Sequence, residues 1–169
     1  MAEESQNTGL GLSAPTDVDS TSLTITVTGL PSVGTVTLAD GTAVSNGMTL
    51  TSAQLAGLQY DAPADLASAT STSFTYTVSD GTSTVTGTST INVTPVNDPP
   101  SFTPGPNQAI AVNAGAQTVN PWATNMSPGP ANESTQTLTF IVTTNNNGLF
   151  SVLPTINANA TGIRERIQT

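Results

Sequence analysis

The chain has 169 residues, including eleven acids and two arginines, and it contains no lysine, histidine or cysteine. Without histidine and cysteine, catalytic triads, cysteine nucleophiles, zinc sites and disulfide scaffolds are excluded, and without lysine so are Schiff-base chemistry and a P-loop. With 8% charged and 36% hydrophobic residues, the chain has the composition of neither a disordered tail nor a membrane protein. Carboxylate chemistry remains, either as a glycosidase-type acid pair or as ligands for a hard cation.

Charge is unevenly distributed along the chain. Both arginines, Arg164 and Arg166, lie in the last six residues, so residues 1–163 carry ten acids, no basic side chain and a net charge of −10. Such a surface repels nucleic acid and anionic membranes, and its carboxylates have no arginine or lysine to pair with. Bound divalent cations are one alternative partner, because Ca²⁺ prefers oxygen ligands. The other interpretation is that the acids keep a polar secreted protein in solution.

Threonine alternates with apolar residues along much of the first hundred residues, which predicts half-buried strands at residues 23–28, 34–38, 74–78 and 91–93. Turn signals separate these runs at Asp40-Gly41, Asn46-Gly47 and Asp80-Gly81. Only residues 52–58 have a helical pattern, sufficient for one or two turns. Short strands with frequent turns indicate an all-β fold, an antiparallel β-sandwich.

A boundary is predicted at residues 95–100, where the sequence Pro-Val-Asn-Asp-Pro-Pro disfavours helix and stiffens the chain. Residues 1–98 therefore form one predicted sandwich. Residues 99–162 form a second unit with strands at 138–142 and 149–152, too short for a closed sandwich of about 100 residues. Residues 163–169 are an atypical tail that matches nothing before it, and we expect either a natural terminus or a non-native end.

Two aspartates, Asp17 and Asp19, are the first candidate site. In an extended segment the side chains at i and i+2 point the same way, so both carboxylates can meet one ion. The alternative is that they cap a turn. An EF-hand is excluded, because Ser22 and Thr28 stand where its loop needs glycine and glutamate. The other loop acids are expected to have local roles: solvation for Asp61 and Asp65, turn formation for Asp80.

Two segments carry a family resemblance: Phe-Thr-Tyr-Thr-Val-Ser-Asp-Gly at residues 74–81, and Ile-Asn-Val-Thr-Pro-Val-Asn-Asp-Pro-Pro at residues 91–100. Through them the first 98 residues resemble a bacterial cadherin-like tandem repeat of large surface adhesins of the repeats-in-toxin type. Residues 102–162 resemble a second repeat type from the same proteins, through Trp-Ala-Thr-Asn at 122–125 and Leu-Phe-Ser-Val at 149–152. The resemblance implies an immunoglobulin/cadherin-like β-sandwich followed by an incomplete second one.

In cadherin-like families calcium is held at the junctions of consecutive domains. Carried over by position, the resemblance implies Ca²⁺ ligands at the junction inside this chain: Glu4, Asn97, Asp98 and Glu133. It also implies that Asp17 and Asp19 face a preceding repeat.

The chain departs from the family pattern at several positions. Thr72 stands where the family usually has aspartate, and Val112-Asn113 stands where the second repeat type usually has a Glu-Asp pair. An aspartate is also common where Asn132 stands. Because each departure removes a charged ligand, we expect the internal calcium site to be weak or empty.

The function implied by the resemblance is not enzymatic. It is that of a calcium-binding structural repeat in a secreted or cell-surface bacterial adhesin, mediating cell adhesion or biofilm attachment as a rigid extender. Its expected partners are neighbouring repeats of the same polypeptide, while other domains would bind host-surface, cell or matrix ligands. Neither nucleic acid nor membrane insertion is expected, and the signal for export would lie outside this segment, since Met1 to Glu4 open acidic and polar. Two alternatives stay open: an accessory carbohydrate-binding or spacer module of a secreted polysaccharide-degrading enzyme, and a truncated product without function.

Overall fold

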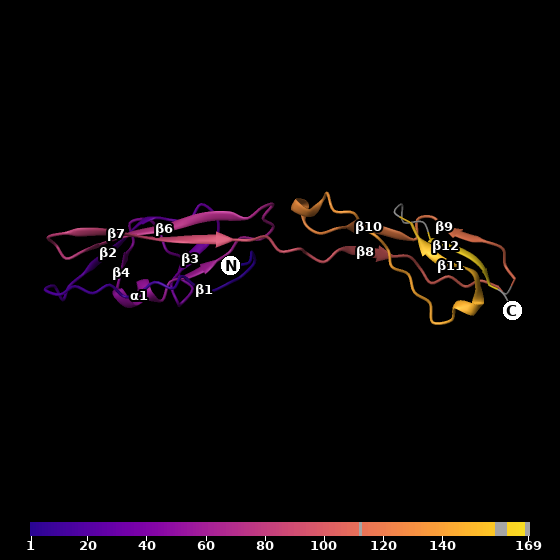
Figure 1. Cartoon of the computed structure of the whole chain (residues 1–169), viewed down its shortest axis with the longest axis horizontal. Coiled ribbons are helices and arrows are strands. Elements are labelled where there is room, and N and C mark those ends of the chain that lie inside the picture. The colour runs from indigo at the N-terminus through magenta and orange to yellow at the C-terminus, as the bar shows by residue number, and fades with distance from the viewer. Residues whose placement is uncertain (112, 158–161, 168–169) are drawn as a thin grey trace. The chain divides into compact units, whose positions relative to one another are not determined.

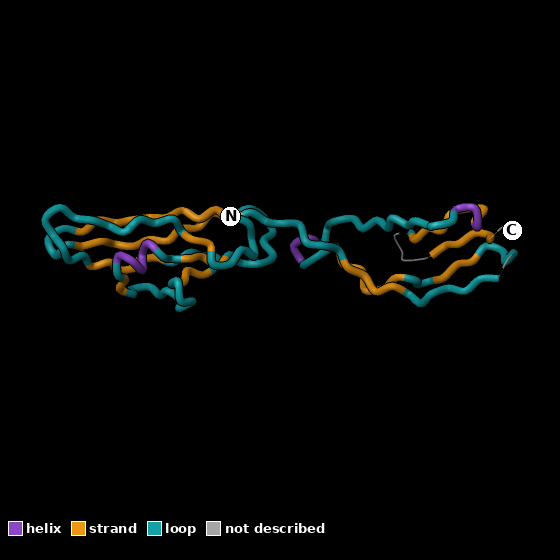
Figure 2. Tube along the Cα trace, turned by 90° about the horizontal axis from the view of Figure 1, so that it is seen from below, coloured by secondary structure: helices purple, strands orange, loops and turns teal. Residues whose placement is uncertain are grey.

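The computed structural model describes residues 1–111, 113–157 and 162–167, and it divides the chain into two units, Met1–Val96 and Asn97–Thr169 (Figure 1). The division lies two residues before the boundary expected from sequence. In both units the sheets are antiparallel, and among the described residues the only helices are one short α-helix and two single 3₁₀ turns (Figure 2). The predicted all-β class is confirmed. No helix in the described ranges is long and apolar enough to cross a membrane.

The first unit contains two antiparallel sheets. The larger has the order β4-β2-β6-β7, with β2 (Thr24–Gly29), β4 (Thr49–Leu50), β6 (Thr70–Ser79) and β7 (Thr84–Val93). The smaller has the order β1-β5-β3, with β1 (Thr8–Gly9), β3 (Thr35–Thr37) and β5 (Gln59–Asp61). Strands are present in all four places where alternation predicted them. Three short strands, β1, β4 and β5, were not predicted.

The single α-helix, α1 (Ser52–Ala56), is also where the sequence predicted it. Its first turn is closed by a capping box, in which the Thr51 hydroxyl accepts from the Gln54 amide at 3.1 Å and the Gln54 side chain accepts from the Thr51 amide at 2.8 Å. The helix ends at Gly57 after burying Leu55. The two reciprocal bonds satisfy amides that would otherwise lack partners at a helix start.

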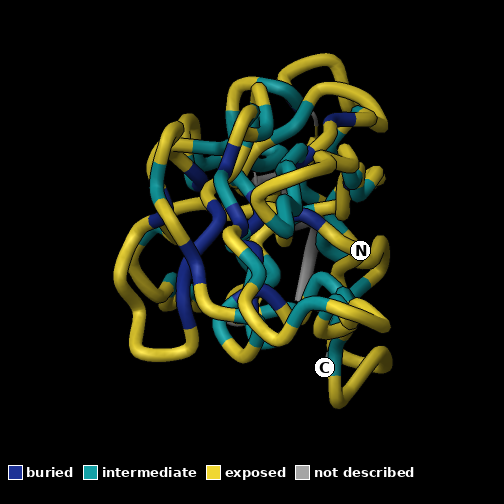
Figure 3. The backbone as a smooth tube through the Cα atoms, turned by 90° about the vertical axis from the view of Figure 1, so that its left-hand side faces the viewer, coloured by how far each residue is buried: buried dark blue, intermediate teal, exposed yellow. Residues whose placement is uncertain are grey.

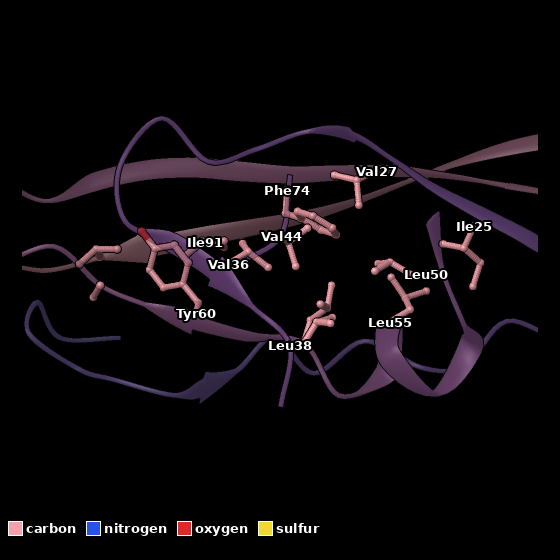
Figure 4. Close-up of a cluster of buried hydrophobic side chains, with 13 residues drawn as sticks. Ile25, Val27, Val36, Leu38, Val44, Leu50, Leu55, Tyr60, Phe74 and Ile91 are labelled. Atoms are coloured by element: carbon pink, nitrogen blue, oxygen red, sulfur yellow. The ribbon is translucent and has the colours of Figure 1, made fainter. Parts of the chain in front are cut away.

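An apolar core fills the space between the two sheets of the first unit (Figure 4). Phe74 and Val27 point inward from the larger sheet, and Val36 and Tyr60 point inward from the smaller one. Nine side chains are almost completely buried: Tyr60, Phe74, Ile25, Leu55, Leu58, Ile91, Val27, Val36 and Val93. Each such side chain stabilises the fold by about 1.5–3 kcal/mol relative to an exposed one, so this unit has its own core.

The second unit also contains two sheets. One pairs β8 (Ser101–Pro104) with β10 (Ala123–Ser127), and the other has the order β11-β12-β9, with β9 (Gln117–Val119), β11 (Phe150–Ile156) and β12 (Gly162–Ile167). The 3₁₀ turns span Ala131–Glu133 and Asn147–Leu149. Most of the tail expected to lie outside the repeats therefore belongs to a middle strand, while residues 168–169 lie outside the described residues.

The strand predicted at residues 138–142 is absent, and this prediction was wrong. The segment does turn apolar side chains inward, and the Phe140 ring meets the Phe102 ring edge-to-face at a centroid distance of 5.2 Å. Its backbone, however, has no neighbouring strand among the described residues. Alternation specifies which side chains face a core, but a strand also needs a hydrogen-bonded neighbour, which alternation does not supply.

Among the described side chains, the second unit buries fewer apolar residues than the first. Figure 3 colours the backbone by burial. Among its described side chains, Ala123 is the one fully buried apolar residue. Several large apolar side chains are exposed: Phe102, Ile141, Val142, Leu149, Val152 and Leu153. A hollow of about 600 Å³ lies beside Trp122 and Phe150. In the residues whose burial is described, the second unit thus has sheets without the filled core that the first unit has.

Candidate cation-binding site

Glu133 is a buried acid in the second unit, and acids are rarely buried unless they are paired. It closes the 3₁₀ turn Ala131–Glu133, and only 6% of its surface is exposed. One carboxylate oxygen, Oε1, accepts a hydrogen bond from the Asp98 backbone amide at 2.9 Å. The other, Oε2, is buried and has no hydrogen-bond partner among the described residues. A buried carboxylate oxygen without a hydrogen-bond donor is a group that a bound cation can neutralise.

The backbone around Glu133 leaves room for this carboxylate. A Cβ atom on Gly129 would lie 1.9 Å from Glu133 Oε2 and 3.4 Å from the Asp98 Cβ, so any larger residue there would displace the carboxylate. The Gly129 carbonyl accepts from the Ser127 hydroxyl at 2.7 Å, which closes the preceding turn. The absence of a side chain at Gly129 therefore leaves the space that the Glu133 carboxylate occupies.

Two further predicted ligands lie next to Glu133. Asn97 Oδ1 accepts from the Gln136 side chain at 2.9 Å, and the Gln136 amide donates to the Glu133 carbonyl at 2.9 Å. Asp98 is half-buried and is held through its own amide by Glu133. Within the second unit, the structure therefore brings together the three predicted ligands that belong to it: Asn97, Asp98 and Glu133.

This set of residues fits a hard cation. Glutamate, aspartate and asparagine oxygens are the donors that Ca²⁺ uses, together with backbone carbonyls and water. No group of three or more His, Cys, Asp or Glu side chains gathers anywhere in the described part of the chain. Two carboxylates, Asp98 and Glu133, would thus need amide or carbonyl oxygens and water to complete a calcium shell.

In the first unit the buried glutamate is Glu3, next to Glu4, whose role as a calcium ligand stays a prediction. Glu3 is 4% exposed; its Oε1 accepts from the Val96 amide at 2.8 Å and its Oε2 accepts from the Leu66 amide. Glu4 is exposed and contributes its backbone amide to the Pro63 carbonyl at 3.0 Å. Sequence reasoning missed Glu3, because the two glutamates lie in a turn, where Glu4 has a φ of +61°, and the amino-acid pattern does not indicate which of them faces inward.

Asp17 and Asp19 form a local turn. Asp17 Oδ1 accepts from the backbone amides of Asp19, at 3.0 Å, and Ser20, at 2.8 Å. A hydrogen bond with the Asp19 side chain, and then those from the two amides, hold the pKa of Asp17 below its ordinary value. The turn-capping interpretation is confirmed, whereas ion binding by this pair stays a prediction.

The turn-forming role expected for Asp80 is confirmed as well. Its Oδ1 accepts from the Ser83 and Thr82 amides at 2.6 and 2.7 Å, and these bonds lower its pKa, against an opposing effect from the charge of Asp17. Asp61, for which only solvation was expected, accepts from the Asn7 amide at 2.7 Å. These acids hold loops in place through backbone amides, unlike Glu133 Oε2.

Comparisons of the chain with protein-family models, with curated proteins and with solved structures give no match. The cadherin-like assignment therefore stays a prediction that depends on the segments at residues 74–81 and 91–100.

Proposed function

We propose that this chain is a calcium-binding structural repeat of a secreted or cell-surface bacterial adhesin, in which it acts as a rigid extender. The observation that carries the proposal is Glu133 Oε2, a carboxylate oxygen in a side chain that is 6% exposed and without a hydrogen-bond donor.

The charge of the chain supports a metal ion as the missing partner. Leaving a buried polar group without a hydrogen bond costs about 1–3 kcal/mol, and more for a charged group. No lysine or arginine occurs in residues 1–163, so that whole stretch has no basic side chain to offer Glu133. A divalent cation would neutralise Glu133 and the neighbouring Asp98 together.

The expected effect of the cation is mechanical. Glu133 Oε1 already holds the Asp98 amide, and Asn97 is already bonded to Gln136. A Ca²⁺ ion bound by Glu133 and Asp98 would add a second tie between the first residues of this unit and the turn at residues 129–136. Fixing those residues would stiffen the start of the unit, which is what an extender made of repeats requires.

Calcium titration by calorimetry tests the proposal. The full chain, stripped of metal, should bind Ca²⁺ with a dissociation constant of about 10⁻⁴–10⁻³ M, as extracellular calcium modules do. Glu133→Gln should remove one site from the binding isotherm, because an amide is a weaker calcium ligand and leaves one carboxylate fewer. Asp65→Asn, which removes the same charge from an exposed loop side chain, is the matched control and should keep the site. Equal isotherms for the parent and Glu133→Gln would refute the assignment of calcium to Glu133.

A further inference from the structure

Residues 137–143, with the sequence Thr-Leu-Thr-Phe-Ile-Val-Thr, are an exposed β-forming segment without a sheet. None of their backbone groups makes a hydrogen bond within the described part of the chain, and five of the seven residues are exposed. Threonine, aromatic and β-branched residues favour strands, and the segment contains no charge, proline or glycine to prevent pairing. The segment therefore has backbone N–H and C=O groups that are free to pair with a strand.

The inner face of this segment is already fixed within the second unit. Leu138 and Phe140 are half-buried, with Phe140 against Phe102, whereas Ile141 points outward and is 91% exposed. The segment is therefore held in place by its side chains while its backbone remains available. This combination is the requirement for adding a strand from another chain.

The segment is also complementary to itself. In an antiparallel pairing centred on Phe140, Leu138 lies opposite Val142 of a second copy, Phe140 opposite its equivalent, Thr139 opposite Ile141, and the terminal threonines opposite each other. These are aromatic, aliphatic and threonine pairs, each of which stabilises a sheet. Because the register is the same from both sides, such a pairing is two-fold.

Charge favours association through the second unit rather than the first. The first unit carries eight acids and no basic residue, a net charge of −8, whereas the second carries three acids and two arginines, a net charge of −1. Two copies therefore repel each other strongly at their first units and weakly at their second units.

We propose that residues 137–143 pair antiparallel with the same residues of a second copy, about a two-fold axis at Phe140, so that the chain forms a homodimer through its second unit. This inference goes beyond the proposed calcium role and does not depend on it.

Sedimentation velocity of the full chain, from micromolar to millimolar concentrations, tests the inference. The parent should convert from monomer to dimer as its concentration rises. Ile141→Lys should weaken the dimer at least about tenfold, because the two lysines would lie diagonally across the new pair and repel each other. Val85→Lys is the matched control: Val85 lies on β7 of the first unit, is also largely exposed, and its substitution should leave the dissociation constant within about twofold.

Amide exchange locates the contact. Protection at residues 137–143 should appear only at concentrations where the dimer forms, and β6 should stay equally protected in all three proteins, which shows that the variants are folded. A parent that remains monomeric at millimolar concentration, a dimer unaffected by Ile141→Lys, or growth beyond the dimer would each overturn the inference. Pairing with a different protein but not with itself would overturn it as well.

Discussion

Replacing Glu3 with glutamine is expected to lower the unfolding free energy of the first unit by about 2–4 kcal/mol. The Glu3 carboxylate accepts backbone hydrogen bonds through both oxygens, from Val96 and from Leu66, in a side chain that is 4% exposed. Glutamine keeps one acceptor and turns its NH₂ group toward the other amide, which is also a donor. The loss should be seen in urea denaturation, and as faster amide exchange at Val96 than at Ile25 in the core.

Glu4→Gln is the matched control for that change. Glu4 is adjacent in sequence, carries the same charge and is exposed, so its replacement should alter the unfolding free energy by no more than about 0.5 kcal/mol. Similar losses for the two variants would mean that net charge, rather than the buried hydrogen bonds of Glu3, controls the stability of this end of the unit.

Gly34→Ala is expected to cost about 3 kcal/mol or more, and to lower the melting temperature of the first unit accordingly. Gly34 has φ +71°, and a Cβ atom there would lie 2.2 Å from the Tyr60 hydroxyl and 2.6 Å from the Asp61 carbonyl. Neither neighbour moves easily. The Tyr60 hydroxyl donates to the Val33 carbonyl at 2.6 Å, and Asp61 is paired with Thr35 between β5 and β3.

Gly41→Ala separates the steric clash from backbone strain. Gly41 has a similar φ of +85°, but nothing lies within 4 Å of its added Cβ. Its replacement should cost only the strain of the left-handed backbone, about 1–2 kcal/mol. Thermal unfolding followed by circular dichroism should therefore show a much smaller loss for Gly41→Ala. Equal losses would show that the contact between Gly34 and Tyr60 is looser than its geometry indicates.

The fold of the first unit could be predicted because its signals are local. Alternation, turn residues and the helical pattern at residues 52–58 each act within a few residues, and together they predicted four of the seven strands and the short helix. The missing strand at residues 138–142 shows the limit of such signals. Leu138 and Phe140 are half-buried there, but whether the segment has a hydrogen-bonded neighbour depends on residues far away in the sequence.

The candidate site shows the same limit. The turn made by Asp17 depends on the next three residues and was foreseen as one of two alternatives. The burial of Glu3 depends on Leu66 and Val96, and that of Glu133 on Asp98 and Gly129, which no local pattern connects. Asn97, Asp98 and Glu133 were selected through the family resemblance, and their proximity is a tertiary property.

The most direct test of the calcium proposal is the thermal unfolding of the second unit in the parent and in Glu133→Gln, each with millimolar Ca²⁺ and with a chelator. In chelator the variant should unfold at a higher temperature than the parent, because it removes a buried charge that has no donor at Oε2. In Ca²⁺ the order should reverse, since only the parent gains stability from binding. Unfolding is followed by the fluorescence of Trp122. Because Trp122 is the only tryptophan in the chain and lies in the second unit, its fluorescence reports on that unit alone. A reversal of order between the two conditions is the result predicted here. The same order in Ca²⁺ and in chelator would contradict calcium binding at Glu133.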